Sequence, residues 1–438
     1  MKNYFRLLTA WAALLTLSAV AGDVSYSNPV ISGDYPDPSV IRVDKDYWAT
    51  ATTSDWAPLF PLMHSTDLVN WKQVGNVFKK RPDWAVGMFW APEISQYQGK
   101  FFVYYVGRQR NGPLSIAVAT AEKPQGPYTD HGPMIGQDAG SIDPVPITDE
   151  KGARYLVWKE DGNSRKQPTP IWAQELSPDG TKLIGEMHEL IRNDVPWEGN
   201  LVEGAFVLKH GDYFYMFYSG NACCGRACTY GLGVARAKKL LGPWEKNPAN
   251  PVIEGNDTWK CPGHGSIVSD PSGNDYLMYH AYSAKDFIYV GRQALLDRVE
   301  WQENGWPRLG NRTPSISAPA PLKKTAKHAE NLFSDDFQSR ELRPEWQWPQ
   351  ANEPVIRKAS NGGITLSANN DHLNDSIGAV LAIKTTSGNY IATTELNLEN
   401  LTSNSSAGLS AYGDHANALG VSIKGGILSI WKRQNNKE

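Results

Sequence analysis

A hairpin-like segment occurs five times along the chain, and this repetition limits the possible folds more than any other feature. In each copy an apolar strand is followed by a polar turn and a second strand rich in aromatic residues, which is typical of a β-hairpin. The fourth copy, residues 201–220, reads LVEGAFVLKHGDYFYMFYSG. An ionisable residue stands near the start of every copy, and these residues are Asp37, Glu93, Asp143, Glu203 and His264.

The spacing of the copies predicts a β-propeller. The five ionisable residues are 50 to 61 residues apart, and a repeat of this length built from short strands is typical of propeller blades. A second motif pair, Val118-Ala-Thr-Ala with Gly126-Pro-Tyr, recurs 116 residues later as Val234-Ala-Arg-Ala with Gly242-Pro-Trp. We therefore predict an all-β chain in which residues 22–314 form a five-bladed β-propeller.

The predicted propeller brings the five ionisable side chains together. The innermost strand of each blade faces the axis, so these side chains converge on one end of it. Carboxylates that lie close together shift one another's pKa values, because like charges disfavour ionisation. We expect Glu93 to be less important for catalysis than the other carboxylates. Asp34 is interpreted first as a turn residue.

Composition excludes some classes of function. The chain has 438 residues, of which 41% are apolar and 20% charged, as in an ordinary globular protein. Its net charge of -3 and the absence of a basic stripe argue against nucleic acid as a partner. Aromatic residues make up 11%, including 16 Trp. They either fill the interfaces between blades or bind the flat faces of sugars.

The N-terminal segment resembles a secretory signal. Lys2 and Arg6 precede an apolar run, Leu7 to Val20, which ends in the small residues Ala19-Val-Ala21. This pattern predicts cleavage near Ala21 and a secreted or periplasmic protein. The run is shorter than the ~20 apolar residues of a membrane span, so we expect no membrane anchor.

Four cysteines lie close to two of the repeats. They are Cys223, Cys224, Cys228 and Cys261. Disulfides are expected in an exported protein, and four cysteines allow three pairings among which the sequence does not decide. A metal site is the alternative, but the spacing lacks a second CxxC or histidine pair.

The composition changes after the propeller. Residues 315–331, rich in Ser, Ala and Pro, are predicted to be a linker. From Leu332 to Glu438 short alternating strands in an Asn-, Ser- and Thr-rich background predict a β-sandwich. The last predicted strand ends close to Glu438, so whether this sandwich is complete stays open.

An ordered set of motifs resembles glycoside hydrolase family 43. The resemblance covers about residues 28–310, and the region from Leu332 onward is similar to the concanavalin-like C-terminal domain of xylosidase-type members. In such members this domain helps to wall the active-site pocket. The motifs are YPDPSVIR from Tyr35, STDLVNW from Ser65, WAPE from Trp90, SIDP from Ser141, VEGAF from Val202 and GHGS from Gly263.

The resemblance implies inverting hydrolysis of a terminal pentose. Asp37 would be the general base, Glu203 the general acid, and Asp143 the residue that orients the acid and raises its pKa. Arg292 would lie near the sugar and the acids. His264 would hold a water or a calcium ion on the axis, or else would be a packing histidine. No cofactor is expected to be required.

The mode of attack is predicted from bulky residues near the axis. Trp56, Phe60, Phe89 and Trp90 are expected to close the sides of a pocket that admits only a chain end. We therefore expect an exo-enzyme that releases α-L-arabinofuranose or β-D-xylose from plant cell-wall glycans. The alternatives are an endo-arabinanase with an open groove and a sugar-binding propeller without catalysis. A retaining fructosidase is disfavoured because its Asn-Asp-Pro-Asn-Gly motif is absent.

Overall fold

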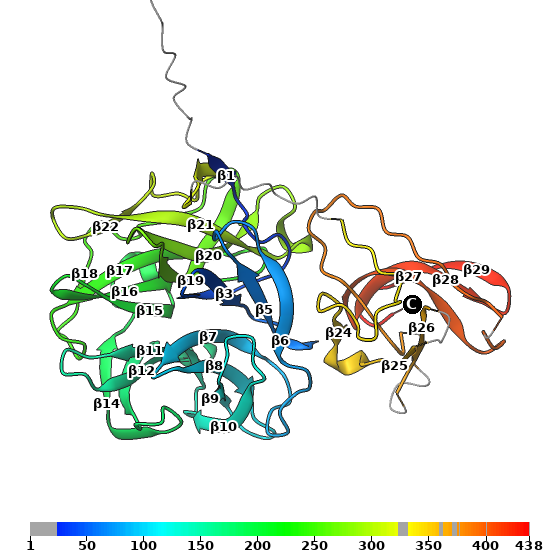
Figure 1. Cartoon of the computed structure of the whole chain (residues 1–438), viewed down its shortest axis with the longest axis horizontal. Coiled ribbons are helices and arrows are strands. Elements are labelled where there is room, and N and C mark those ends of the chain that lie inside the picture. Colours follow the sequence, from blue (N-terminus) through cyan, green and yellow to red (C-terminus); the bar gives the residue numbers. More distant parts are fainter. Residues whose placement is uncertain are drawn as a thin grey trace, which may run out of the picture.

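The computed structural model describes residues 24–322, 332–358, 362–369, 375, 377–399 and 401–437. Figure 1 shows two parts, a large body of strands and a smaller C-terminal part. The prediction of an all-β chain is confirmed. The only helices among the described residues are four short 3₁₀ helices: η1 (Gly162–Arg165), η2 (Pro196–Glu198), η3 (Phe287–Tyr289) and η4 (Gln350–Asn352).

The large body consists of five four-stranded antiparallel sheets. In each sheet the strands follow one another in chain order, as in the blades of a propeller. The first three sheets are β2 (Ser39–Val43), β3 (Asp46–Thr50), β5 (Leu59–Ser65) and β6 (Lys72–Phe78); β7 (Trp90–Tyr97), β8 (Lys100–Arg108), β9 (Leu114–Ala121) and β10 (Thr129–Ile135); and β11 (Ser141–Thr148), β12 (Arg154–Glu160), β13 (Ile171–Leu176) and β14 (Leu183–Ile191).

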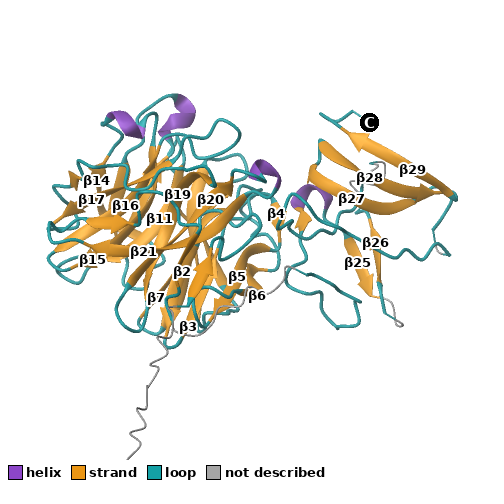
Figure 2. Cartoon of the chain, turned by 90° about the horizontal axis from the view of Figure 1, so that it is seen from above, coloured by secondary structure: helices purple, strands orange, loops and turns teal. Residues whose placement is uncertain are grey.

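The first strands of the five sheets form a closed ring. Each contacts the first strand of the next sheet, and the strand of the fifth sheet contacts that of the first. Figure 2 shows the large body from above, with its strands joined by loops and a few short helices. The remaining two sheets are β15 (Val202–His210), β16 (Tyr213–Gly220), β17 (Gly231–Ala237) and β18 (Glu245–Lys246); and β19 (Trp259–Ser269), β20 (Asp275–Ser283), β21 (Arg292–Trp301) and β22 (Pro307–Leu309).

The hairpins form where the sequence places them. In the fourth blade, β15 pairs with β16 from Val202 opposite Gly220 to His210 opposite Tyr213, so the turn contains Gly211 and Asp212. Such a turn needs a residue with positive φ, and Gly211 has a φ of 56°. The short turn forces the two strands into an antiparallel pair, which starts at the end of the blade that carries Glu203.

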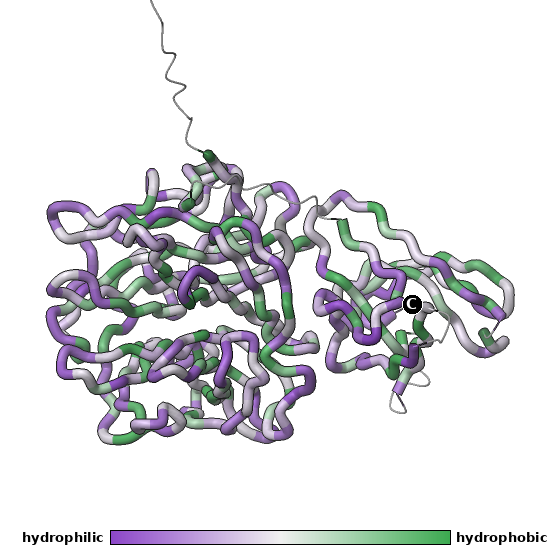
Figure 3. The backbone as a smooth tube through the Cα atoms, viewed as in Figure 1, coloured by the Kyte–Doolittle hydropathy of each residue, from purple (hydrophilic) through white to green (hydrophobic). Residues whose placement is uncertain are grey.

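The hydrophobic core is divided among the blade interfaces. Five clusters of buried residues each join strands of two neighbouring blades. Many of the aromatic residues lie there, since the largest fully buried side chains include Trp158, Tyr104, Tyr218 and Phe217. Figure 3 shows apolar stretches within the strands and mostly hydrophilic turns at the periphery. Much of the aromatic excess therefore packs blades together.

The inner strands are irregular where they begin. Register shifts occur between Trp90 and Glu93, between Ile142 and Val145, and between Glu203 and Phe206. Bulges of this kind redirect side chains and are frequent next to active sites. Residues with positive φ mark the same places in all five blades: Asp37 (53°), Ala91 (41°), Asp143 (58°), Gly204 (59°) and His264 (32°).

The N-terminal segment closes the propeller. Strand β1 (Ser25–Ser27) pairs with β23 (Ser317–Pro319), which lies within the predicted linker. The Asn28 side chain binds the backbone of Leu296 in β21 through both its amide nitrogen and its oxygen. The predicted secretory signal, residues 1–21, lies outside the described residues. Within those residues no helix is long and apolar enough to cross a membrane.

The C-terminal part consists of small sheets. Strand β24 (Trp348–Pro349) pairs with β4 (Trp56–Ala57) of the propeller and so links the two parts. A small core contains Ile377, Val380 and Ala418. The other strands are β25 (Val355–Lys358) and β26 (Ile364–Ser367), which pair with each other, and β27 (Ser406–Asp414), β28 (Asn417–Lys424) and β29 (Ile427–Arg433), which form a three-stranded sheet.

Candidate active site

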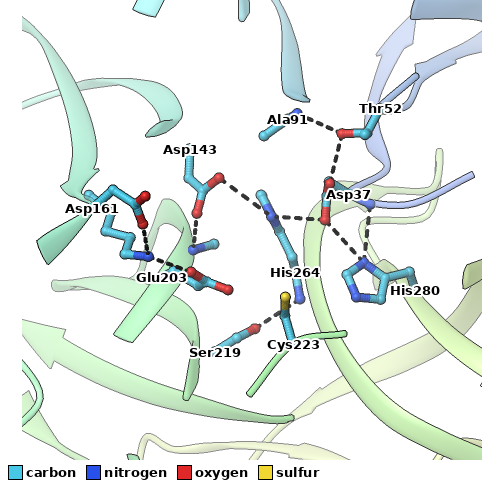
Figure 4. A network of polar contacts seen from close by, with 12 residues as sticks. Asp37, Thr52, Ala91, Asp143, Asp161, Glu203, Ser219, Cys223, His264 and His280 are labelled. Atoms are coloured by element: carbon cyan, nitrogen blue, oxygen red, sulfur yellow. Dashed lines mark hydrogen bonds and ion pairs between the residues drawn. The ribbon is translucent and has the colours of Figure 1, made fainter. Parts of the chain in front are cut away.

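The three predicted catalytic carboxylates lie at the same end of the inner strands. Asp37 lies two residues before the start of β2, Asp143 lies in β11 and Glu203 lies in β15. Their exposed fractions are 9%, 7% and 8%, so all three are largely withdrawn from water. In Figure 4, His264 lies between Asp37 and Asp143, and Glu203 lies near Asp143 and is linked to Asp161 through Lys159.

Asp37 is surrounded by hydrogen-bond donors and cations. Its Oδ2 accepts a hydrogen bond of 2.7 Å from the Thr52 hydroxyl, and its Oδ1 lies 3.3 Å from a guanidinium nitrogen of Arg292 and 3.4 Å from Nδ1 of His264. Burial by itself raises the pKa of Asp37. The positive charge of Arg292 and the contact with His264 outweigh burial and hold the pKa well below its usual range.

His264 lies between two of the carboxylates. Its Nδ1 is 3.4 Å from Asp37 and 4.0 Å from Asp143 (Figure 4). Burial lowers the pKa of an imidazole, but the two negative charges raise the pKa of His264 to about 9. Its backbone N–H donates to the Ser219 hydroxyl at 2.9 Å, which holds this part of β19 against β16. Near neutral pH His264 is therefore a fixed positive charge on the axis.

Asp143 has the opposite electrostatic character to Asp37. Its Oδ2 accepts a 2.8 Å hydrogen bond from the backbone N–H of Gly204, the residue after the predicted acid. Burial and the negative charge of Glu203 raise its pKa to about 6, although His264 acts in the other direction. Gly204 is required here because a Cβ at this position would lie 2.7 Å from Cγ of His264. The backbone of β15 thereby places Glu203 beside Asp143.

Both carboxylate oxygens of Glu203 accept hydrogen bonds. Nζ of Lys159 lies 2.6 Å from Oε2, and the Tyr230 hydroxyl donates to Oε1 at 2.9 Å. Lys159 is 1% exposed and also binds Asp161 at 2.9 Å. Burial lowers the pKa of Lys159, but Glu203 and Asp161 outweigh it and raise this pKa above its usual value. The orientation of the Glu203 carboxyl is thus defined from both sides.

A second chain of contacts runs from Tyr230 to Asp37. The Tyr230 ring stacks on the ring of His280, with centroids 5.9 Å apart and planes at 7°. Nδ1 of His280 accepts the backbone N–H of Asp37 at 3.1 Å, which assigns the ring proton to Nε2. Burial lowers the pKa of His280 to about 4, so the ring is neutral. Gly263 leaves room for Tyr230, because a Cβ there would lie 2.3 Å from the tyrosine ring.

Glu93 lies two residues beyond the position with positive φ in its blade, Ala91. Burial raises the pKa of Glu93 to about 8, while a hydrogen bond with Ser39 and the charge of His264 oppose this rise. Glu93 is therefore a neutral carboxylic acid near pH 7. That Glu93 is less important for catalysis than the other carboxylates stays a prediction.

The structure places the four aromatic residues predicted to contact the sugar in different surroundings. Phe89 and Phe60 have no exposed surface and pack against each other in the core between the first two blades, so the prediction that they wall the pocket is wrong. Trp90 is half-buried at the start of β7. Trp56 is also half-buried and contacts Tyr412 of the C-terminal part, with ring centroids 5.7 Å apart. Of the four aromatic residues predicted to contact the sugar, only the two tryptophans remain candidates.

Arg292 lies where the sequence predicts it, beside Asp37. Its backbone N–H also donates to the side chain of Asp34 at 2.8 Å, so Asp34 fixes the start of β21 against the first blade. Four further residues of the site were not predicted: Thr52, Lys159, Tyr230 and His280. Lys159 and His280 directly follow the aromatic runs of their strands. A polar residue directly after an aromatic run was therefore the signal in the sequence that could have identified Lys159 and His280.

The four cysteines form two disulfides, Cys223–Cys224 and Cys228–Cys261. The second disulfide joins the loop between β16 and β17 to β19. Cys261 packs with Leu201 and Tyr230 in a small buried cluster next to the site. The pairing that the sequence left open therefore holds the segment with Tyr230 against the neighbouring blade.

The site residues do not form a metal site of the usual kind. Among the described residues, no three His, Cys, Asp or Glu side chains are grouped to hold a metal ion. Nδ1 of His264 faces two carboxylates, and the raised pKa keeps a proton on the ring. A protonated imidazole nitrogen does not ligate a metal. A calcium ion held through water stays a prediction, and we derive no step through it.

Known proteins are similar to a large share of the chain. A xylosidase/arabinosidase from Butyrivibrio fibrisolvens is 29% identical over 350 residues, which are 73% of this chain and 65% of that protein. The chain thus spans less than two thirds of that relative's length. An extracellular exo-α-(1→5)-L-arabinofuranosidase from Cellvibrio japonicus is 28% identical over 306 residues, 63% of this chain and 86% of that protein.

A solved structure confirms the propeller. The crystal structure of a thermostable family-43 glycoside hydrolase superposes with a TM-score of 0.62 at 30% identity, and covers 68% of this chain and 99% of that chain. Residues 334–437 match the β-xylosidase C-terminal concanavalin A-like domain. Residues 26–307, more than half of the chain, match the glycosyl hydrolases family 43. The protein belongs to glycoside hydrolase family 43.

Proposed function

We propose that the protein is an exo-acting, inverting glycoside hydrolase that releases terminal pentose units from plant cell-wall glycans. The observation that carries this proposal is the contrast between the carboxylates. Asp37 is held ionised by cations, whereas Asp143 and Glu203 lie together on the other side of His264. An inverting enzyme needs one carboxylate as a base and another carboxyl group as an acid on opposite sides of the scissile bond.

Asp37 acts as the general base. Its lowered pKa keeps it ionised near neutral pH, so it is ready to take a proton from water. Arg292 and Thr52 fix the carboxylate from two sides. The attacking water is polarised by Asp37 as it adds to the anomeric carbon, and the configuration at that carbon inverts.

Glu203 acts as the general acid and delivers a proton to the leaving oxygen. Asp143 assists it in two ways, through its negative charge beside Glu203 and through its hydrogen bond to the Gly204 backbone. A negative neighbour favours the protonated form of a carboxyl group. Tyr230 and Lys159 keep the acid in place.

The exo mode of attack is supported by the relatives and by the position of the C-terminal part. Both named relatives are described as enzymes that act on xylosides or arabinosides, and one name states exo action. Tyr412 and Trp348 of the C-terminal part contact the Trp56 segment of the propeller. We propose that Trp56, Trp90 and Arg292 line the sugar pocket. An endo-arabinanase is the alternative within the family.

Two measurements on the purified protein test the proposal. Proton NMR of the first product from an aryl pentoside should show the anomer opposite to the bond cleaved, and a retained configuration excludes the mechanism. Early products from linear arabinan and xylan should be monosaccharides, and oligosaccharides that appear first show an endo-enzyme. Binding of these glycans without turnover supports a sugar-binding propeller instead.

We also propose that the protein acts outside the cytoplasm, on plant polysaccharides or oligosaccharides. The predicted secretory signal and the two disulfides support this location, because disulfides persist in oxidising compartments. N-terminal sequencing of the protein recovered from its native host checks the cleavage site. A mature protein that still begins at Met1 contradicts the proposed export.

A further inference from the structure

A cavity of about 460 Å³ lies between the fourth and fifth blades, next to the acid–base site. Its lining includes Trp197, Tyr230, Glu254, Lys260 and the Cys228–Cys261 disulfide. Ligand-binding pockets in proteins typically have volumes of ~300–1,000 Å³, so the cavity is large enough for sugar units. The mechanism described above makes no use of it.

The cavity is placed on the side of the general acid. Tyr230 is shared by the two sites, because it lines the cavity and its hydroxyl binds Glu203 at 2.9 Å. Trp197 lies in η2 just before β15, and Lys260 lies at the start of β19. Both therefore lie at the end of the propeller that carries the catalytic residues. In glycoside hydrolysis the acid lies beside the leaving oxygen, so the leaving sugar extends toward this side.

The chemistry of the lining suits a neutral sugar. The Trp197 ring is held firmly, because it lies against Gly220 and Gly233 so closely that a Cβ on either glycine would be 2.8 or 2.5 Å from it. The carboxylate of Glu254 and the ammonium of Lys260 are exposed, and neither is paired within the described part of the chain. An aromatic ring suits the apolar face of a sugar, and one acceptor and one donor suit its hydroxyls.

We propose that this cavity binds the leaving-group portion of the substrate, as one or more neutral pentose units beyond the cleaved bond. The inference rests on the proposed function, since it assigns Glu203 as the acid. If the cavity binds these units, the enzyme should cleave short pentose chains better than glycosides of a single pentose. The opposite charges of Glu254 and Lys260 leave the lining without a net charge, which favours neutral sugars over uronate-bearing ones.

The test compares chain lengths. We would measure kcat/KM on the disaccharide and tetrasaccharide of β-1,4-xylose and of α-1,5-arabinose, for the wild type, Lys260→Ala and Glu254→Ala. The wild type should prefer the tetrasaccharide. In each variant the tetrasaccharide-to-disaccharide ratio should fall at least about 5-fold, the scale of one lost hydrogen bond to a charged group. Matched controls are Lys151→Ala and Glu303→Ala, in turns at the opposite end of the blades.

Each outcome decides the proposal. A wild type that cleaves aryl pentosides but shows no length preference, or variants whose ratios equal those of the controls, overturn the cavity assignment and leave the proposed function intact. A stronger preference for a uronate-substituted tetrasaccharide overturns the choice of a neutral ligand. If no pentoside is cleaved, the proposed function fails, and calorimetric titration of xylotetraose into the wild type and Lys260→Ala decides separately whether the cavity binds it.

Discussion

The hydroxyl of Tyr230 donates a 2.9 Å hydrogen bond to Glu203, and the ring of the same tyrosine stacks on His280. His280 in turn accepts the backbone N–H of Asp37. The proposed acid and the proposed base, from the fourth and the first blade, are therefore positioned through one shared aromatic pair. Burial and the negative charge of Glu203 raise the pKa of Tyr230 well above its usual value, so it remains a donor.

Replacing Tyr230 by Phe should show whether it positions the acid. The change removes one hydrogen bond to a charged group, so we expect turnover of an alkyl pentoside to fall about 10-fold or more. Dinitrophenyl pentosides, which need little help from an acid, should be affected much less. A purely structural role would slow both substrates equally. Tyr213→Phe, at the start of β16 at the other end of the fourth blade, is the control.

The assignment of acid and base is tested by amide substitutions. Asp37→Asn and Glu203→Gln should each lower kcat by at least ~100-fold on a substrate with a poor leaving group, the usual contribution of an acid–base group. Circular dichroism and thermal midpoints establish that the variants are folded. Near-normal activity of Glu203→Gln on such a substrate would refute the assignment. Glu303→Gln, on the opposite end of the propeller, serves as the control.

Titration of Asp143 should affect the pH dependence of kcat/KM. Because its pKa is raised to about 6, the wild-type profile of kcat/KM should contain a transition near that pH, which Asp143→Asn should remove. In the same variant the alkaline limb should move to lower pH, since a neutral side chain no longer repels negative charge on Glu203. An alkaline limb that stays in place contradicts the proposed role of Asp143.

Glu93 predicts a pH-dependent change in stability. The folded protein releases its proton at about 8, whereas the unfolded chain releases it near the usual 4.5. A raised pKa means that the folded state binds the proton more tightly, so the wild type loses stability as the pH rises through this window. Glu93→Gln lacks that loss. The thermal midpoint of the variant, relative to the wild type, should therefore be higher at pH 8 than at pH 4.5.

The comparison of the two pH values separates this effect from general damage. A packing defect caused by Gln would lower the midpoint equally at both. An unchanged difference between the variant and the wild type at pH 8 and pH 4.5 would show that Glu93 ionises normally in the folded state. Glu303→Gln should show no change of this kind, because Glu303 is exposed.

The hairpin pattern was sufficient to predict the propeller and the position of its three main carboxylates. Turn residues and alternating apolar strands are local properties, and a closed ring of similar units places equivalent strand ends together whatever the details of packing. For this reason Asp37, Asp143 and Glu203 were found without a structure. The same argument failed for Phe89. Its place in the sequence, just before an inner strand, does not show whether its side chain faces the pocket or the next blade.

Only the tertiary structure decided the electrostatics of the site. Asp37 and Asp143 are the same residue type at matching places, yet one has a lowered pKa and the other a raised pKa, because Arg292 and His264 contact the first more closely. In the fourth blade the residue with positive φ is Gly204, so Glu203 lies one residue before it, whereas Asp37 and Asp143 have positive φ themselves. The sequence repeat does not show this difference.

The hydrogen-bond partners of Glu203 also show which properties the sequence determines and which depend on the tertiary structure. The sequence by itself determined the repeat, the turns and the types of residue that converge on the axis, since these follow from local backbone preferences. Which donors meet which carboxylate depended on contacts between strands far apart in the chain, such as Lys159 from the third blade and Tyr230 from a disulfide-bonded loop of the fourth. Such contacts depend on how the blades pack, and no local pattern specifies them.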